Sequence, residues 1–266
     1  MSKAIKKRKK TSSTLTKRIG WMIGVITLSL LLYIGYMYGR HLKRFEIAHA
    51  THYPAFGIDI PDGFLIHGID VSRHQDEIAW DEVKKMNING VKVNFVYIKA
   101  TEGLESVDTN FRANWLNAGR QGISRGAYHF FIATKNGKLQ AQNFIKTVKL
   151  QPGDLPPVLD IEEVYTANPD SMIAEIKDWL TTVENEYGKR PIIYSYANFY
   201  EKYLAGSFDD YPLWVAHYLE SRGPRIGRDW VFWQHSEEGH VNGITSPVDF
   251  NVFNGDSTDF EKLKLK

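Results

Sequence analysis

After residue 64 this chain alternates between short apolar runs, rich in β-branched and aromatic residues, and amphipathic segments. The apolar runs predict strands near residues 65–71, 95–99, 126–131, 157–161, 191–196, 213–216, 231–234 and 248–250. Apolar side chains at helical spacing predict four helices between the early strands, around residues 80–86, 111–118, 139–148 and 172–183. Strands that alternate with helices favour a parallel sheet, and a set of eight matches a (β/α)8 barrel.

The last quarter of the chain breaks the alternation. After Leu213 the segments between strands are short and rich in Gly and Pro, which leaves no room for complete helices. We therefore expect an α/β protein with an irregular (β/α)8-like TIM-type barrel whose last quarter has incomplete helices. A doubly wound open sheet is the alternative, and it is disfavoured because no glycine-rich phosphate loop follows the first strand.

The N-terminal part has a different character. Residues 19–38 carry no charge, and at helical rise these twenty or so residues span about 30 Å, the thickness of a bilayer's hydrocarbon core. The run is longer than the apolar region of a signal peptide, and it ends in Tyr36, Tyr38 and Arg40 instead of the small residues of a cleavage site. We expect an uncleaved transmembrane helix over residues 19–39.

Charge around this segment predicts its orientation. Eight basic residues lie before it, and Arg40, Lys43 and Arg44 follow it. The excess favours a cytoplasmic N-terminus and a single-pass protein of the cell (inner) membrane whose large domain is extracytoplasmic. The expected organisation is a basic cytoplasmic tail over 1–18, a transmembrane anchor over 19–39, a juxtamembrane linker over 40–62 and the barrel over 63–266.

Composition excludes several classes of function. The chain has a net charge of +2, but its excess of basic residues lies in the N-terminal tail and the rest of the chain is net negative, so no nucleic-acid-binding face is expected. Cysteine is absent, which excludes thiolate-zinc sites and cysteine nucleophiles. Nine histidines occur without an H-E-x-x-H pattern, so no metal site is expected.

The run from Pro157 to Glu163 is an apolar strand that ends in carboxylates. Asp160 and Glu162 are two positions apart and share one face of that strand. In α/β barrels the carboxyl ends of the strands face the site of chemistry, and two acids there suit glycoside hydrolysis. The alternative is a surface acid pair where a strand ends in a polar loop. Glu163 points to the other face and is expected to be solvated or ion-paired.

The other expected strand ends supply polar or aromatic side chains as well. Carboxylates interleaved with aromatic rings are what the hydroxyls and apolar faces of a pyranose require. Lys99 could contact a sugar or form a structural ion pair with Glu102, and His129 is expected to be a hydrogen-bonded wall residue. The candidate sugar-binding side chains are Lys99, Tyr128, Tyr194, Tyr196, Trp214 and Gln234, with Trp233 a further stacking candidate.

Eight ordered motifs between about residues 64 and 255 carry a resemblance to a known family. They are HGIDVSRHQ, VYIKATEG, RGAYHFF, PPVLDIE, PIIYSYA, PLWVAHY, FWQHS and GITSPVDFNVFNG. The domain resembles glycoside hydrolase family 25, the Chalaropsis-type lysozymes that cut the linkage between muramic acid and glucosamine in peptidoglycan. One departure is Asp76-Glu77, where the family usually has Gly, and we expect it to alter loop shape instead of chemistry.

The resemblance implies roles for four acids. Glu162 matches the family's general acid, and Asp160 would be its ionised neighbour, which positions the 2-acetamido group or stabilises the transition state. Asp70 and Asp249 complete the acidic site. Burial and a nearby charge would keep Glu162 protonated near neutral pH. Direct displacement and participation of the substrate's own N-acetyl group both remain open.

The resulting expectation is a membrane-anchored muramidase that hydrolyses the β-1,4 bond between N-acetylmuramic acid and N-acetylglucosamine. Its partners would be peptidoglycan strands and, through the N-terminal helix, the lipid bilayer. No cofactor is implied, and the sequence does not indicate the oligomeric state. Two alternatives are a non-catalytic peptidoglycan-binding tether and a hydrolase of another N-acetylated polysaccharide, such as chitin.

Overall fold

The computed structural model describes residues 21–24, 26–35, 37, 50–218 and 220–266. The chain divides into two compact units, Met1–Ile47 and Ala48–Lys266. In the first unit the described residues are helical. No helix within the described residues is both long enough and apolar enough to cross a membrane. The expected tail over 1–18, the remaining positions of the expected anchor and residues 40–49 of the expected linker lie outside the described residues.

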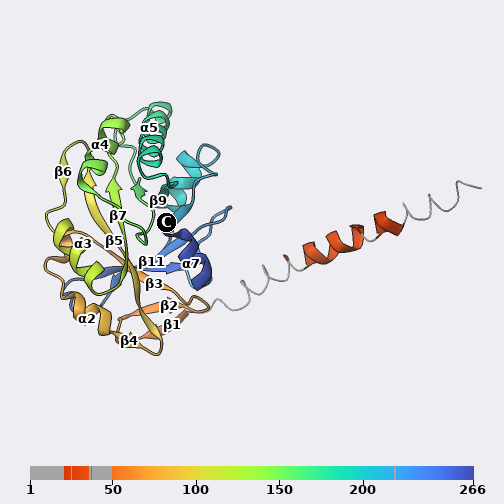
Figure 1. Cartoon of the computed structure of the whole chain (residues 1–266), viewed down its shortest axis with the longest axis horizontal. Coiled ribbons are helices and arrows are strands. Elements are labelled where there is room, and N and C mark those ends of the chain that lie inside the picture. The colour runs from red at the N-terminus through yellow and green to blue at the C-terminus, as the bar shows by residue number, and fades with distance from the viewer. Residues whose placement is uncertain (1–20, 25, 36, 38–49, 219) are drawn as a thin grey trace, which may run out of the picture. The chain divides into compact units, whose positions relative to one another are not determined.

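The second unit is built on eight strands that follow one another in chain order around a ring (Figure 1). Pairing of the first of them, β3, with the second, β5, closes the ring into a barrel. All eight expected strands are therefore confirmed. They are β3 (His67–Val71), β5 (Val91–Glu102), β7 (Ser124–Phe130), β8 (Val158–Asp160), β9 (Ile192–Tyr196), β10 (Leu213–Ala216), β11 (Phe232–Gly239) and β12 (Val248–Phe253).

One strand runs against the others. From β3 to β11 neighbouring strands are parallel, but β12 is antiparallel to both β11 and β3. The expectation of a wholly parallel sheet is wrong here because only residues 240–247 join β11 to β12, too few for the crossover that a parallel pair requires. The first residues of β12, instead of its last, therefore lie at the end of the barrel where the parallel strands finish, which we call the barrel mouth.

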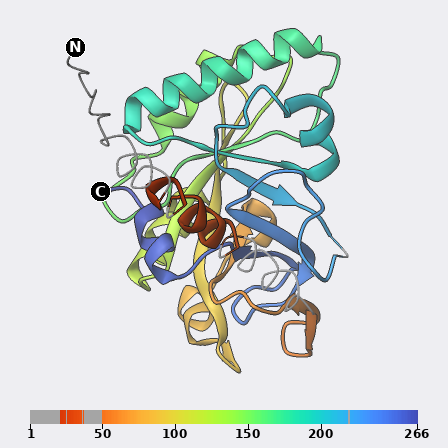
Figure 2. The same ribbon diagram turned by 90° about the vertical axis from the view of Figure 1, so that its right-hand side faces the viewer.

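The four expected helices are confirmed as α2 (Trp80–Lys85), α3 (Phe111–Arg120), α4 (Gly137–Thr147) and α5 (Pro169–Tyr187). Asn136 and Asn168 cap α4 and α5 by accepting hydrogen bonds from backbone N–H groups of the first turn. After β9 only short turns remain, α6 (Ala197–Phe199) and η2 (Tyr200–Leu204), and within the described residues no helix joins β10, β11 and β12. The contrast between long α5 and the loop-joined last strands is visible in Figure 2. A final helix, α7 (Ser257–Leu263), follows the barrel.

Two apolar cores hold the barrel. One lies between the strands and the surrounding helices and contains Trp179 and Phe144. The other fills the barrel interior with aromatic rings, among them Tyr97 and Trp214, whose centroids lie 4.9 Å apart. Gly126 makes this packing possible because a Cβ atom there would overlap the ring of Tyr97. The interior is thus a filled core that leaves only the mouth open to chemistry.

Residues that the sequence assigned to a linker belong to the folded unit. Strands β1 (Ala50–Tyr53) and β2 (Ile58–Pro61) form an antiparallel hairpin. At its turn Phe56 is fully buried, with its ring centroid 5.2 Å from that of Phe250, and its carbonyl accepts a bond of 2.9 Å from the His240 N–H. The expected linker over 40–62 is therefore wrong for residues 50–61. Its alternating Phe56, Ile58 and Ile60 are a short strand signal that the scattered charge obscured.

Three small elements remain among the described residues, two at the ends of β5 and one after β3. Strand β4 (Asn87–Ile88) forms a hairpin with the beginning of β5, and β6 (Ser106–Val107) pairs with its end. A single 3-10 turn, η1 (Arg73–Gln75), follows β3 and is held by a capping box between Ser72 and Gln75. These turns shape the segment that follows Asp70.

Candidate active site

Four acids meet at the barrel mouth. Asp70 lies near the end of β3, Asp160 ends β8, Glu162 follows two residues later and Asp249 is the second residue of β12. Strand register places Asp70 directly opposite Asp249. The charge of Glu162 acts on Asp160, and that of Asp70 acts on both Asp160 and Glu162. Segments that are far apart in the sequence thus bring all four predicted acids into one electrostatic cluster.

A network of side-chain amides holds Asp70. Its Oδ2 accepts hydrogen bonds from Gln234 Nε2 at 2.9 Å and from Asn251 Nδ2 at 2.7 Å. Hydrogen bonds to the oxygen of each amide fix its orientation. Gln234 Oε1 accepts from the hydroxyls of Tyr194 at 2.8 Å and Tyr218 at 2.6 Å. Asn251 Oδ1 likewise accepts from the indole of Trp214 at 2.8 Å. The amide donors therefore cannot turn away from Asp70 without breaking several buried bonds.

The Asp70 and Asp249 carboxyls form one interacting pair. Burial, and then the charge of the neighbouring Asp70, raise the pKa of Asp249 to about 9. Burial also raises the pKa of Asp70, but hydrogen bonds from Asn251 and Gln234 oppose the rise by stabilising its anion. The proton of this pair therefore resides on Asp249, and Asp70 is the charged member near neutral pH.

The Asp160 and Glu162 carboxyls form a second interacting pair. Burial, and then the charge of Glu162, raise the pKa of Asp160 well above its ordinary value. Burial raises the pKa of Glu162 as well, while its hydrogen bond with Asp160 opposes the rise. Asp160 is the more deeply buried of the two, so burial raises its pKa more strongly. This direction differs from the expectation that Asp160 is the ionised partner of Glu162.

The predicted sugar-binding side chains fall into two groups. Tyr196 is exposed at the mouth. Tyr128 is half-buried, and burial, followed by the charges of Asp70 and Asp160, raises the pKa of its hydroxyl. Tyr194, Trp214 and Gln234 are buried in the network that supports Asp70. This second group positions the acids, and the stacking role expected for Trp214 does not fit its buried ring. Trp233, on the outer face of the sheet, is also buried, with its indole N–H on the His217 carbonyl at 2.8 Å.

Lys99 forms an ion pair with Glu102 at 2.7 Å, and its ammonium lies 4.6 Å from the centroid of the Phe130 ring. The structural ion pair is thus present, and the Lys99 charge also lowers the pKa of both Asp160 and Glu162. Glu163 is exposed, as expected for the residue on the opposite face of the strand.

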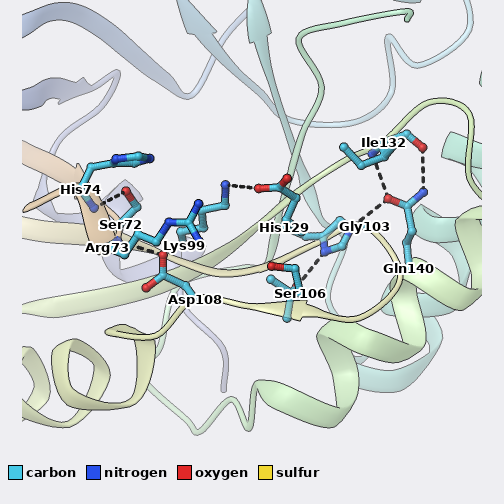
Figure 3. Close-up of polar contacts among 12 residues, drawn as sticks. Ser72, Arg73, His74, Lys99, Gly103, Ser106, Asp108, His129, Ile132 and Gln140 are labelled. Atoms are coloured by element: carbon cyan, nitrogen blue, oxygen red, sulfur yellow. Dashed lines mark hydrogen bonds and ion pairs between the residues drawn. The ribbon is translucent and has the colours of Figure 1, made fainter. Parts of the chain in front are cut away.

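His129 lies on the outer side of the strand wall. Its Nδ1 is 2.7 Å from Thr101 Oγ1 and its Nε2 is 3.2 Å from Gln140 Oε1. Burial lowers the pKa of His129 to about 3, so the ring stays neutral. Gln140 in turn bonds both backbone groups of Ile132, which ties the loop after β7 to α4 (Figure 3). The prediction of a hydrogen-bonded wall residue is confirmed.

Two residues of the site had no assigned role from the sequence. Asn251 donates to Asp70, and Tyr218 orients Gln234. The signal for Asn251 was its position two residues after Asp249, on the same face of one strand. Tyr218 follows β10 in a loop, where no periodicity marks the direction of a side chain.

Among the residues that the structure describes, no cluster of three or more His, Cys, Asp or Glu side chains has the arrangement of a metal site. Asp70 has two carboxamides as hydrogen-bond partners, and Asp160 interacts with Glu162.

Comparisons with known proteins agree on the family. Residues 69–244 match the family described as "Glycosyl hydrolases family 25". The chain is 43% identical over 258 residues to "Uncharacterized protein YegX" of Escherichia coli K12, covering 96% of this chain and 94% of that protein. It is 36% identical over 210 residues to "Lysozyme M1" of Streptomyces globisporus, covering 71% and 68%.

Solved structures show the same likeness in three dimensions. The structure of a family 25 glycosyl hydrolase from Bacillus anthracis matches with a TM-score of 0.71 and 31% identity, covering 81% of this chain and 97% of that one. A family GH25 lysozyme from Aspergillus fumigatus matches with a TM-score of 0.67 and 30% identity, covering 76% and 99%. This chain therefore belongs to glycosyl hydrolase family 25.

Proposed function

We propose that this glycoside hydrolase is a muramidase that cuts the β-1,4 bond between N-acetylmuramic acid and N-acetylglucosamine in peptidoglycan, with Glu162 as the general acid. The relatives named lysozyme support the substrate class. The observation that carries the assignment of roles is the Asp160–Glu162 pair, which burial keeps partly protonated at the mouth of the barrel.

Glu162 is the member of that pair that reaches substrate. It is half-buried, whereas Asp160 is almost fully buried behind it. A glycosidic oxygen can therefore take a proton from Glu162, and the proton that Asp160 holds can pass to Glu162 through their hydrogen bond. Such a relay keeps the acid protonated near neutral pH, which general acid catalysis at a sugar oxygen requires.

Asp70 and Asp249 supply the complementary charge. Asp70 is the anion of its pair, and its two amide donors hold it in one orientation. A fixed carboxylate in the same cluster as the acid stabilises the positive charge that develops on the sugar ring. Asp249, which keeps its proton, can donate a hydrogen bond to the substrate or to Asp70.

Sugar rings contact the aromatic side chains that are open at the mouth. Tyr196 is 37% exposed and is the principal stacking surface among the predicted residues, with Tyr128 deeper in the site. Lys99, held by Glu102, contributes its charge to the pKa of the acids. Tyr194, Trp214 and Gln234 act through Asp70 and Asn251 and are positioning residues.

The test of the general acid is Glu162→Gln. The amide keeps the shape of the side chain but has no carboxyl proton to donate, so the rate of peptidoglycan hydrolysis should fall by a factor of about 10² to 10⁴. Turbidity loss of a peptidoglycan suspension measures the rate, and co-sedimentation measures binding, which should persist. The matched control is Glu186→Gln, an exposed carboxylate near the end of α5 that does not contribute to the pKa of Glu162, so its loss should leave the rate unchanged.

Two outcomes would replace this proposal. Equal rates for the parent protein and Glu162→Gln, with binding intact, would indicate a non-catalytic tether. Mass spectrometry of the products identifies the bond that is cut: reducing muramic acid ends support a muramidase, and reducing glucosamine ends show a different specificity.

We also propose that the uncharged run over residues 19–38 anchors the protein in the cell membrane, with its N-terminus in the cytoplasm and the barrel outside. The support is the length of the run and the basic residues before it. The similarity to the Escherichia coli relative covers 96% of this chain, so most of the N-terminal segment has a counterpart there.

Membrane fractionation tests the anchor. The full chain should stay with the membranes after carbonate extraction, because a helix that crosses the bilayer is not released by breaking electrostatic contacts. A variant without residues 1–40 should be released. Protease added from the outer side of the membrane should cleave the barrel, and protease added from the cytoplasmic side should not. The reverse pattern would refute the orientation.

A further inference from the structure

Tyr165 occupies an unusual place in the loop that follows the acid pair. The loop after β8 contains a four-residue turn closed by a 3.1 Å hydrogen bond from the Ala167 N–H to the Val164 carbonyl. Val164 and Ala167 pack against the apolar core, which fixes both ends of the turn. Tyr165 is the first of the two central residues, and it lies three residues after Glu162. The turn therefore fixes the backbone position of Tyr165 in the loop that contains the proposed general acid.

The backbone of Tyr165 is strained. Its φ angle is +52°, in the left-handed region that favours glycine. Turns with a positive φ at their first central position are dominated by Gly, Asn and Asp, and a bulky aromatic residue there is exceptional. Strain of this kind persists only where surrounding structure maintains it, and it concentrates at functional sites. Glycine at this position would relieve the backbone strain, yet the chain has a tyrosine here.

The ring of Tyr165 is also open to solvent. It is 46% exposed, and within the described part of residues 48–266 the only exposed large aromatic side chains are Tyr165 and Tyr196. Partial burial, and then the charges of Glu163, Glu102, Glu162 and Asp160, raise the pKa of its hydroxyl. The same acids, Glu162 and Asp160, also act on the hydroxyl of Tyr196. The hydroxyls of both open aromatic rings of the folded unit therefore lie within electrostatic range of the proposed proton donor.

We propose that Tyr165 is a substrate-binding residue of the mouth, whose ring packs on a sugar of the glycan strand next to the bond that is cut. This inference rests on the proposed function and adds a contact that the predicted site did not include. An exposed aromatic face offers the apolar surface that a pyranose face needs, and a tyrosine side chain has only two rotatable χ angles to immobilise. Tyr165 lies in the loop after β8, and Tyr196 ends the adjacent strand β9. The charge of Glu162 acts on the hydroxyl of each.

The test measures binding in full-length protein that carries Glu162→Gln, so that the ligand is not consumed. The probe is a soluble tetrasaccharide of alternating N-acetylglucosamine and N-acetylmuramic acid, titrated by calorimetry. Tyr165→Gly should raise Kd about tenfold, the factor expected for one lost aromatic contact. The same substitution should leave Tm unchanged or higher because glycine relieves the positive φ. Tyr165→Phe, which keeps the ring, should bind like the parent.

Asn89 provides the matched control. It also has a positive φ, +54°, but lies in the turn between β4 and β5, at the beginning of β5, so Asn89→Gly relieves strain without touching the mouth. Its Kd should equal that of the parent. An unchanged Kd in Tyr165→Gly, with peptidoglycan cleavage by the native protein intact, would overturn the role of Tyr165 alone. Absence of both cleavage by the native protein and tetrasaccharide binding would overturn the proposed function together with this inference.

Discussion

At the scale of single residues, the site is organised by two pairs of acids whose members have different surroundings. In each pair one carboxyl retains the proton and the other is charged or open to substrate, because two adjacent anions in a poorly solvated site repel each other. Amide side chains decide which member of the Asp70–Asp249 pair is charged: Gln234 and Asn251 each present an N–H group to Asp70. The chemical difference between two identical carboxyl groups is thus set by their neighbours.

Asp249 makes stability depend on pH in a predictable direction. Its pKa is about 9 in the folded protein and near the ordinary value of 3.8 in the unfolded chain. Between these values the folded state binds more protons, so its contribution to stability is complete at acidic pH and is lost as pH rises toward 9. Asp249→Asn removes this dependence, and the variant should gain stability relative to the parent as pH rises from 5 to about 9.

Urea denaturation at several pH values measures that difference. Groups outside the Asp70–Asp249 pair contribute to both proteins alike, so the difference in the free energy of unfolding reports the titration of that pair. A difference that stays constant over this pH range would contradict the raised pKa of Asp249.

At the scale of elements, the barrel depends on glycines where aromatic rings fill its interior. The ring of Tyr97 on β5 occupies the space beside Gly126 on β7, and the ring of Phe95 occupies the space beside Gly68 on β3. These strands are neighbours in the sheet. Small residues on one strand therefore accommodate large ones on the next, which is how a narrow barrel reaches native packing density.

Gly126→Ala tests this packing. The new methyl group would overlap the Tyr97 ring, and the buried barrel interior has little room to move aside, so the free energy of unfolding should fall by about 2 to 3 kcal/mol. Thermal and chemical denaturation measure the loss. Gly227→Ala is the control, because a Cβ atom there meets no neighbour within 4 Å, and its stability should be close to that of the parent. Equal stability of the two variants would refute the tight packing.

At the scale of the whole molecule, the folded unit begins before the barrel does. The β1–β2 hairpin buries Phe56, Ile58 and Ile60, and β2 packs beside β11. Any part of the chain that joins the folded unit to an N-terminal anchor would therefore end at the hairpin, about residue 50, instead of at the first barrel strand.

Two truncations distinguish these boundaries. A variant without residues 1–47 should unfold at the same temperature as the barrel of the full chain. A variant without residues 1–62 loses three buried apolar side chains and exposes Phe250, so its free energy of unfolding should be lower by at least about 3 kcal/mol. Calorimetry of the two proteins makes the comparison, and identical transition temperatures would show that the hairpin contributes nothing.

The sequence by itself determined the eight barrel strands, the four helices between the early ones and the set of polar residues at the strand ends. These features are local: side-chain periodicity and strand ends can be read within a short window of residues. The motif with Asp160 and Glu162 needed nothing more, since two residues on one strand share a face whatever the rest of the fold does.

Tertiary structure alone decided the reversed direction of β12, the inclusion of the hairpin and the location of the protons. Each depends on contacts between distant segments: β12 pairs with β3, Phe56 packs on Phe250, and Gln234 reaches Asp70. The buried state of Trp214 and the exposed state of Tyr165 likewise follow from what surrounds them. Burial and the electrostatic field at an ionisable group are properties of the packed molecule, and no window of sequence contains them.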